Sequence, residues 1–436
     1  MSRFLFVVPP LTGHINPVVG VAAELAARGH RVAWACPDPA LVRRLAGEGA
    51  DVFVCAGAPE GERPPELRGP EALRFLWEWF LLPLAEAMAP GVRAAVDAFR
   101  PDVVVADQQA FAGALVAERL GVPWVTSAST SAEFTDPLSG LPKVREWVAE
   151  RLRELRDAIG DPAGTADPRF SPLLVLAFSV PELAGEAQGV HWVGPSVVSR
   201  PAGSDFPWEW LDPDRATVLV SLGTANTDVG GRFLDVCARA LRERADRVQG
   251  VIVDPGGILG TGTARPTGTD AGTNTGTGTG SDASPGAARP DATPVAPGAP
   301  AVPSAPSTPA VRAAADKDLL VLPHVPQLAL LERASAVVSH AGHNTVCEAL
   351  WHGVPLVVAP IRDDQPVVAG QVADSGAGIR VRFGRVTADR LGAALDAVLD
   401  DPAHRAAAAR IRSALRAAGG AVAAADRLDL LARELS

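Results

Sequence analysis

Short, wholly apolar runs alternate with helical patterns along this chain of 436 residues. Residues 4–8 (FLFVV) and 103–106 (VVVA) carry no polar side chain, which is typical of strands buried on both faces of a parallel sheet. Their alternation with helices favours an α/β fold with doubly wound parallel sheets over an antiparallel architecture. In the first half we expect strands near residues 4–8, 31–35, 103–106 and 123–126, with helices that include 17–28 and 110–120.

The chain is long for one domain and suits two domains of roughly 200 residues each. A fresh strand at residues 218–221 (VLVS) marks the start of the second domain. We therefore expect a first domain over 1–207, a linker over 208–215, a second domain over 216–410 and a C-terminal helical segment over 411–436.

Residues 257–315 differ from the rest of the chain, because Gly, Thr, Ala, Pro and Ser dominate them. So little bulky apolar material cannot offset the entropy of ordering the chain. We predict a disordered insertion inside the second domain. Its glycines lack the spacing of a phosphate loop, and no function is expected there.

Composition narrows the class of partner. The hydrophobic content of 47% with 21% charged residues is that of a globular protein. A net charge of −10 argues against nucleic acid or an anionic membrane surface as the main partner. No apolar run reaches the roughly 18 residues that a membrane-spanning helix needs.

The cysteines and the first eleven residues indicate the cellular compartment in which the protein is expected. The four cysteines are scattered without a C-x-x-C pair, so neither a zinc site nor a disulfide framework is expected. Residues 1–11 are apolar but interrupted by Pro9 and Pro10, which favours a strand over a signal peptide. A reducing cytoplasm is the expected location.

The most informative stretch of the second half is a strand, a turn and a helix. Residues 335–339 (SAVVS) predict a buried strand, and 345–352 predict a helix closed by Gly353, with Asn344 or Thr345 as its N-cap. A helix N-terminus after a Gly-containing turn presents free N–H groups and a positive dipole end, where a pyrophosphate binds well.

Side chains beside this turn strengthen the prediction of a nucleotide site. His340 and Asn344 supply donors for phosphate oxygens. Glu348 lies four residues after Asn344, on the same helix face and one turn deeper. Its carboxylate is suited to accept hydrogen bonds from ribose hydroxyls.

The first half carries a candidate base. His14 follows the first strand, in a loop that precedes Asn16 and Pro17, the expected N-cap and first residue of a helix. Asp107 ends the strand at 103–106, so both side chains fall at the carboxyl edge of the sheet, where ligands bind in open α/β folds. A carboxylate there fixes the tautomer of a histidine base. The alternatives are a loop histidine without a role and a helix-capping aspartate.

Three elements in this order resemble the donor-sugar signature of the inverting, nucleotide-sugar-dependent glycosyltransferases, which include plant UDP-glycosyltransferases and bacterial macrolide glycosyltransferases. They are His324-Val325-Pro326-Gln327, the core from His340 to Glu348, and Asp364-Gln365. Two further elements are similar to motifs of the same family: Gly13-His14-Ile15-Asn16-Pro17, and Ser221-Leu222-Gly223-Thr224 at the head of the second domain.

The resemblance implies a GT-B fold, in which two doubly wound domains face each other across a cleft. It implies His14 as general base, held by Asp107, and a last helix that crosses back to brace the first domain. The donor-binding residues that it implies are His324 on the base, Gln327 and Glu348 on the ribose, Ser221, Gly223, Thr224, His340, Gly342, Asn344 and Thr345 on the phosphates, Asp364 and Gln365 on the sugar, and Val325 and His343 within the signature. Plant members usually carry Trp where this chain has His324 and His343.

The acceptor side is less defined. The aromatic stretch over residues 75–82 places Phe75, Trp79 and Leu82 on one helical face. Such a face is more often core than ligand wall, and an acceptor-lining role for Phe75 and Trp79 is the alternative. The family resemblance implies a hydrophobic acceptor, such as a macrolide, another polyketide, a terpenoid or a phenol.

The donor is expected to be a UDP-hexose, with a dTDP-deoxysugar as the alternative. A missing sugar hydroxyl would leave the buried polar groups of Asp364 and Gln365 unpaired. No cofactor is expected and no metal, because the helix N-terminus meets the charge of the leaving diphosphate; Asp363-Asp364 is where a metal would have to bind.

Three other functions are compatible with parts of the pattern. A lipid glycosyltransferase would need a basic, apolar surface segment, and an epimerase of the same fold would need no acceptor base. A non-catalytic helper protein should have lost catalytic or donor residues, which are intact here.

Overall fold

The structure is a computed structural model that describes residues 1–435 apart from 60, 62–63, 65–66, 68, 136–137, 139, 198–205, 224–229 and 260–313. Two sheets organise the described residues, with strand orders β3-β2-β1-β4-β5-β6-β7 and β10-β11-β9-β8-β12-β13-β14. All neighbouring pairs are parallel except β10 with β11. The predicted α/β class with two doubly wound parallel sheets is confirmed.

The first sheet and its helices occupy residues 3–192. Its strands are β1 (Arg3–Val7), β2 (Arg31–Cys36), β3 (Val52–Val54), β4 (Val103–Asp107), β5 (Trp124–Ala128), β6 (Val175–Ala177) and β7 (His191–Trp192). Its helices are α1 (Thr12–Ala27), α2 (Pro39–Ala46), α3 (Gly69–Phe75), the π-helix η1 (Leu76–Leu81), α4 (Leu82–Phe99), α5 (Phe111–Arg119), the 3₁₀ turn η2 (Ala132–Thr135), α6 (Pro142–Ile159) and α7 (Pro181–Ala184).

The second sheet follows the 3₁₀ turn η3 (Trp208–Trp210). Its strands are β8 (Ala216–Ser221), β9 (Val248–Val253), β10 (Ala314–Ala315), β11 (Leu319–Leu322), β12 (Ala336–Ser339), β13 (Leu356–Val358) and β14 (Gly378–Arg380). Its helices are α8 (Gly231–Arg242), α9 (Gln327–Leu331), α10 (His343–Trp351), α11 (Gln365–Asp374), α12 (Ala388–Asp400) and α13 (Pro402–Ala417), and the chain ends with α14 (Gly420–Glu434).

The apolar run of β1 is explained by burial on both faces. Phe4 and Phe6 join the core beneath α1 and α14, whereas Leu5 and Val7 join the core beneath α4 and α5. All four side chains are inaccessible to solvent. Because successive side chains of a strand point to opposite faces, both sets must be apolar when helices cover both faces.

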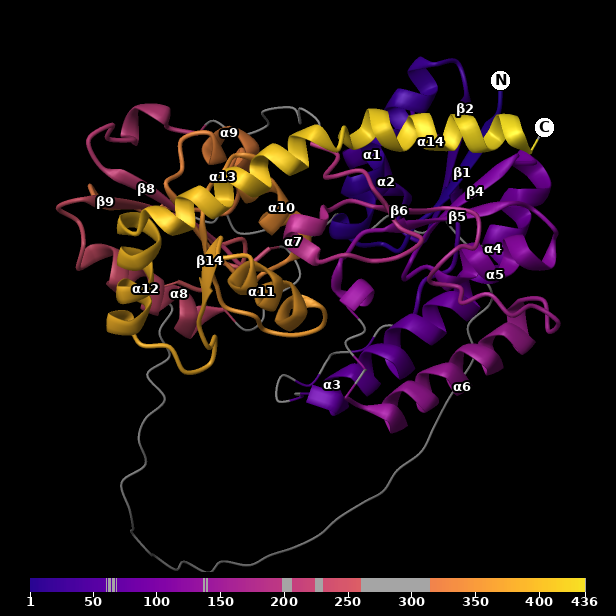
Figure 1. Cartoon of the computed structure of the whole chain (residues 1–436), viewed down its shortest axis with the longest axis horizontal. Coiled ribbons are helices and arrows are strands. Elements are labelled where there is room, and N and C mark those ends of the chain that lie inside the picture. The colour runs from indigo at the N-terminus through magenta and orange to yellow at the C-terminus, as the bar shows by residue number, and fades with distance from the viewer. Residues whose placement is uncertain are drawn as a thin grey trace, which may run out of the picture.

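The two C-terminal helices connect the domains. Ile411 and Leu415 of α13 pack in the core of the second domain, and Leu428 of α14 packs in the core of the first. The chain turns between the two helices at Gly419 (φ 88°) and Gly420 (φ 58°), values that favour glycine. Figure 1 shows the yellow helix pair running from one lobe to the other, with both termini at the same end. The expected boundary between the second domain and the C-terminal segment, at 410/411, falls inside α13, which continues to Ala417.

Most of the expected insertion lies outside the described residues, since only 257–259 and 314–315 of it are described. The sequence analysis missed one element there: Ala314 and Ala315 form β10, which pairs antiparallel with β11.

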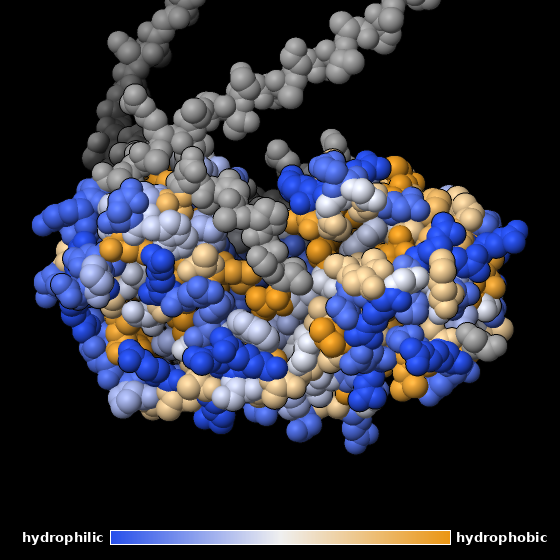
Figure 2. Space-filling model, turned by 90° about the horizontal axis from the view of Figure 1, so that it is seen from above, coloured by the Kyte–Doolittle hydropathy of each residue, from blue (hydrophilic) through white to orange (hydrophobic). Residues whose placement is uncertain are grey.

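No helix among the described residues is long and apolar enough to cross a membrane. Figure 2 shows hydrophilic and hydrophobic residues interspersed over the face that it presents. This mixture is normal for an exposed protein surface.

Gly113 allows α5 to approach the first sheet, which gives a test of the packing. A Cβ at this position would lie 2.8 Å from Ala106 Cβ and 2.9 Å from Val7 Cβ, so we expect Gly113→Ala to lower the free energy of unfolding by about 1–3 kcal/mol. Gly370 of α11 is the matched control, because a Cβ there meets nothing within 4 Å, and Gly370→Ala should stabilise by about 0.5–1 kcal/mol. Urea denaturation of both variants measures the difference, and equal stabilities would contradict the packing.

Candidate active site

The two predicted first-domain residues meet at the carboxyl edge of the sheet. His14 Nδ1 lies 2.9 Å from Asp107 Oδ1, and the Asp107 side chain is completely buried. The same Oδ1 accepts a hydrogen bond from the backbone N–H of Gln109, so the carboxylate is fixed by its own loop. Since an ionised carboxylate only accepts, the His14 proton belongs on Nδ1 and the lone pair on Nε2.

The expected position of His14 in a loop was wrong, because α1 begins at Thr12 and holds His14 in its first turn. Pro17 is inside this helix and has no N–H to give to the carbonyl of Gly13, four residues before it. That carbonyl instead accepts a hydrogen bond of 2.9 Å from Asn344 Nδ2 in the second domain. The proline therefore leaves an acceptor for the other domain directly beside His14.

Acidic neighbours tune the pKa of His14. Burial lowers this pKa, but the charge and hydrogen bond of Asp107 and the charge of Asp364 outweigh the effect of burial. The pKa lies above its ordinary value of 6.5 in consequence. The side chain is 15% exposed, which leaves the imidazole accessible from the cleft.

A third side chain lies beside His14 and was not predicted from the sequence. Ser129, directly after β5, places its Oγ 2.7 Å from His14 Nδ1. The next two residues also carry buried hydroxyls: Thr130 donates to Asp364 Oδ2 at 2.7 Å, and Ser131 donates to Gln371 Oε1 at 2.6 Å. A run of hydroxyl residues just after a strand was the available signal, by the same argument that identified Asp107.

The turn after β12 has a strained backbone. Ala341 adopts φ 66°, a left-handed value that is rare outside glycine, and its side chain is completely buried. Gly342 follows as the N-cap of α10, so the expectation that Asn344 or Thr345 caps the helix was wrong. Both residues lie in the first turn instead, because the left-handed residue turns the chain into the helix two positions earlier. The first N–H groups of α10 have no acceptor within the helix.

The His340 side chain lies between Gly342 of this turn and Gly223, which comes after β8. A Cβ at Gly223 would lie 2.8 Å from His340 Cε1, and a Cβ at Gly342 would clash with Nε2. Burial lowers the pKa of His340 to about 4, and the charge of Arg362 contributes, whereas a backbone hydrogen bond at Ser221 opposes the shift. The ring is therefore neutral near pH 7 and carries one N–H donor. Thr224, the last residue of the adjoining motif, lies outside the described residues.

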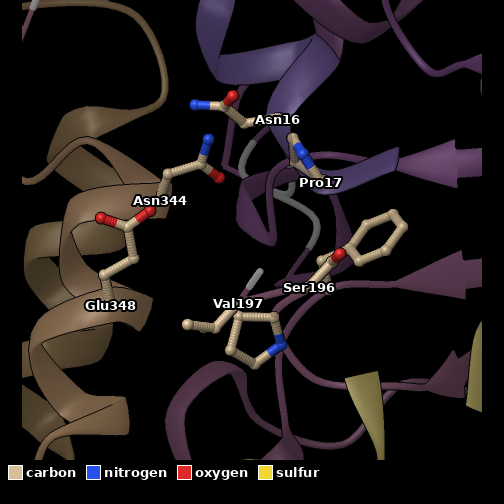
Figure 3. A pocket seen from close by; sticks show the side chains of 8 residues that line it. Asn16, Pro17, Ser196, Val197, Asn344 and Glu348 are labelled. Atoms are coloured by element: carbon tan, nitrogen blue, oxygen red, sulfur yellow. The ribbon is translucent and has the colours of Figure 1, made fainter. Parts of the chain in front are cut away.

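A pocket enclosing about 290 Å³ of empty space separates α10 from the first domain. Figure 3 shows Asn344 and Glu348 of α10 on one side of it and Asn16 and Pro17 of α1 on the other. Gln327 Nε2 donates a hydrogen bond of 2.6 Å to Glu348 Oε2, which joins the two predicted ribose contacts. Of these two residues, Glu348 lines the pocket.

Asp364 and Gln365, the predicted sugar contacts, already have partners. Asp364 accepts the hydrogen bond from Thr130, and Gln365 Oε1 accepts from the N–H groups of Ile361 and Arg362. Burial raises the pKa of Asp364; the Thr130 bond and the charge of His14 oppose this, and Asp363 adds to it. The charge of Asp364 raises the pKa of His14, so the two groups interact electrostatically.

The remaining predicted donor residues differ in exposure. His324 is exposed, as a ring that stacks on a base must be, whereas Val325 packs against the second-domain core and Thr345 is buried. His343 Nε2 lies 3.3 Å from the carbonyl of Phe178 in the first domain, so its ring lies at the contact between the domains.

The aromatic stretch is not the simple core face that helical spacing favours. Phe75 and Trp79 stack with ring centroids 5.7 Å apart, and Trp79 is 61% exposed. Trp77 and Leu81 are the buried pair instead. The wider turn of the π-helix η1 accounts for this change of face.

In the part of the chain that the structure describes, no group of three or more His, Cys, Asp or Glu side chains could hold a metal ion. The pocket beside α10 is lined by two amides, a hydroxyl and a single carboxylate together with apolar side chains: Asn16, Asn344, Ser196, Glu348, Pro17, Phe178, Pro195 and Val197.

Comparisons with known proteins match both halves of the chain. Residues 12–159 match the model of a glycosyl transferase 4-like domain, and residues 305–427 match that of the erythromycin biosynthesis protein CIII-like C-terminal domain. The chain is 28% identical to a demethyllactenocin mycarosyltransferase of Streptomyces fradiae, over 98% of this chain and 86% of that protein. It is 29% identical to a 4'-demethylrebeccamycin synthase of Lentzea aerocolonigenes, over 98% and 99%. Both halves of the chain are therefore similar to glycosyltransferases of natural-product biosynthesis.

The solved structures agree with this assignment. The glycosyltransferase of kitacinnamycin superposes on this chain with a TM-score of 0.73 and 25% identity, covering 99% of this chain and 98% of that one. The GT-B fold that the sequence motifs implied is confirmed.

Titration of the imidazoles tests the electrostatics of the site. We expect His14 to titrate above pH 6.5, whereas His340 and His343 stay neutral until about pH 4 because burial disfavours their charged forms. Asp107→Asn removes the charge that raises the pKa of His14, so this pKa should fall. NMR of the ring protons measures all three, with His14→Ala to assign the signal. An unshifted His14 in Asp107→Asn would contradict the pairing.

Proposed function

We propose that this protein transfers a sugar from a nucleoside diphosphate to a hydroxyl of a hydrophobic natural product, with inversion at the anomeric carbon and with His14 as base. The observation that carries the proposal is the His14–Asp107 pair directly beside the N-terminus of α10. Asn344 of that helix bonds the carbonyl of Gly13, so base and phosphate site adjoin each other. The two reacting molecules would therefore meet at this contact.

In the proposed reaction His14 Nε2 takes the proton of the acceptor hydroxyl. The oxygen attacks the anomeric carbon from the face opposite the diphosphate, and the bond from that carbon to the diphosphate oxygen breaks. Asp107 holds the Nδ1 proton and stabilises the imidazolium that forms. The leaving diphosphate departs with the electron pair of the broken bond.

Charge on the diphosphate would be met by groups that are already in place. The N–H groups at the start of α10 and the dipole of the helix favour an anion there. His340 lies beside these groups with its single N–H on the Ser221 backbone, and the Ser221 hydroxyl, at the end of the neighbouring β8, adds a donor. Fixed donors of this kind need no reorganisation during the reaction, which is why no metal ion is part of the proposal.

The first candidate donor is a UDP-hexose. Gln327 and Glu348, paired beside the pocket, are suited to a ribose with two hydroxyls. Asp364 and Gln365 would contact hydroxyls of the hexose.

A dTDP-deoxysugar is the second candidate, and a specific observation favours it. Asp364 and Gln365 are hydrogen-bonded within the protein, so a sugar that lacks a hydroxyl does not leave them unpaired. A solved spinosyn rhamnosyltransferase of the same fold is complexed with thymidine diphosphate; its TM-score is 0.68 at 20% identity, and the match covers 98% of this chain and 100% of that one.

For the acceptor we propose an apolar scaffold that reaches His14 from the first domain. Trp79, stacked on Phe75 and largely exposed, offers a flat surface for such a molecule. Phe75 is half-buried, so the face of Trp79 is the exposed part of this pair.

Loss of the base should abolish transfer but preserve donor binding. We expect His14→Ala to reduce kcat by about 10²–10⁴-fold, because general base catalysis contributes that much. The control is His191→Ala on β7, a half-buried histidine away from the pair, which should keep the activity. Transfer is measured with UDP-glucose and dTDP-glucose against a panel of hydroxylated polyketides and phenols. A His14→Ala variant with wild-type transfer would contradict the role of His14 as base, and absence of transfer by the wild type together with epimerisation of the donor sugar would point to an epimerase.

Nucleotide binding tests the donor site separately. We expect UDP and dTDP to bind in the presence of EDTA, and binding of the preferred nucleotide to weaken about tenfold or more in His340→Ala, which removes a buried donor. Isothermal titration measures both, and the melting temperature of the variant controls for its folding. The tighter nucleotide selects the donor class. Absence of binding by either would contradict the proposal and favour a helper protein.

A further inference from the structure

Three consecutive hydroxyl residues after β5 each contact a different part of the site. We call Ser129, Thr130 and Ser131 the hydroxyl segment; all three are at least 96% buried. Ser129 Oγ lies 2.7 Å from His14 Nδ1 in the first domain. Thr130 bonds Asp364 Oδ2 at 2.7 Å in the second domain. One short stretch of backbone thus contacts both the base and the opposite domain.

The contact with the second domain is made at two points of one helix. Asp364 is the residue before α11, and Gln371 lies two turns into it. Gln371 accepts from Ser131 Oγ at 2.6 Å and its Nε2 donates to the Ser131 carbonyl at 3.4 Å. Thr130 Oγ1 also accepts from the N–H of Ala132 at 3.3 Å, which holds the hydroxyl toward Asp364. The hydroxyl segment is therefore bound to α11 as a unit.

A movement of α11 would shift the hydroxyl segment and, with it, the contact between Ser129 and the His14 imidazole. Adjacent Cα atoms are 3.8 Å apart, so Thr130 cannot shift with Asp364 without shifting Ser129. Ser129 is one of two groups at His14 Nδ1, together with Asp107. If the domains separate, Thr130 loses its carboxylate partner and Ser129 loses the support that places it against the imidazole.

Resting on the proposed function, we propose that Thr130 is a positioning residue that couples closure of the two domains to the orientation of the base. The base is then held for proton transfer only while α11, which begins at the proposed sugar contacts Asp364 and Gln365, is docked on the first domain. Such coupling would limit proton abstraction to the closed, donor-loaded state.

Charged groups lie around both ends of this connection. The hydrogen bond from Thr130 favours the ionised form of Asp364, and the charge of Asp364 raises the pKa of His14. Loss of the Thr130 hydroxyl should therefore raise the pKa of Asp364 and lower that of His14. The other titratable groups that act on this pair are Asp107, Glu133, His343 and Asp363.

The test compares Thr130→Val with Thr130→Ser. Val keeps the shape of Thr and removes the hydroxyl, whereas Ser keeps the hydroxyl. Thr135→Val is the matched control, because Thr135 is exposed on η2 and its hydroxyl donates to the carbonyl of Ala132 in its own turn. Two readouts apply to the full-length protein: transfer from UDP-glucose and dTDP-glucose to 4-methylumbelliferone, followed by fluorescence, and the pKa of His14 by NMR.

We expect Thr130→Val to lower kcat about tenfold or more, with a smaller change in the donor KM, and to lower the pKa of His14. Thr130→Ser and Thr135→Val should match the wild type in both readouts. A Thr130→Val protein with wild-type kcat and wild-type His14 titration would overturn the inference. So would a Thr130→Ser protein as impaired as Thr130→Val, because that would show a role of shape alone.

Failure of the inference can be told apart from failure of the proposed function. The NMR readout needs no turnover, so a lowered His14 pKa in Thr130→Val without sugar transfer by the wild type would refute the function and retain the coupling. Active wild type with an unaffected Thr130→Val would refute the coupling alone. Melting temperatures of all variants show whether a lost activity reflects unfolding, and a Thr130→Val loss explained by unfolding would count against the coupling.

Discussion

The parallel arrangement of both sheets is the constraint on which the site depends. In a parallel sheet every strand ends at the same edge, so the polar residues that follow different strands collect there. Asp107 and Ser221 are the last residues of β4 and β8. Ser129 and His340 come directly after β5 and β12. The two edges face each other, and the proposed chemistry is located where they meet.

Groups buried at this meeting of edges are satisfied across the domain boundary. Gly13 offers a carbonyl that Pro17 cannot use, and Asn344 takes it. Asp364 and Thr130 form a second such pair. A buried polar group without a partner costs about 1–3 kcal/mol, so these contacts favour docked domains over separated ones.

The outline of the fold and the chemistry of each half could be predicted from the sequence. Wholly apolar runs such as residues 103–106 indicate parallel strands because helices cover both faces, and this holds wherever the run occurs. Asp107 and His14 were found because a strand end is visible in the sequence. The start of α1 was misplaced, since Pro17 by itself indicates a first helical residue, whereas in the structure it is the sixth residue of the helix.

The sequence by itself determined the strand–helix alternation, the placement of His14 and Asp107 near strand ends, and the order of the predicted donor motifs, because all of these are local patterns. Tertiary structure decided that Ser129 contacts His14 over 115 positions and that Thr130 contacts Asp364 over 234. A hydroxyl side chain can hydrogen-bond to almost any neighbour, so its type alone does not select a partner. Only the packing of two separate sheets brings these groups within hydrogen-bonding distance, and the pKa values of His14 and Asp364 follow from that proximity.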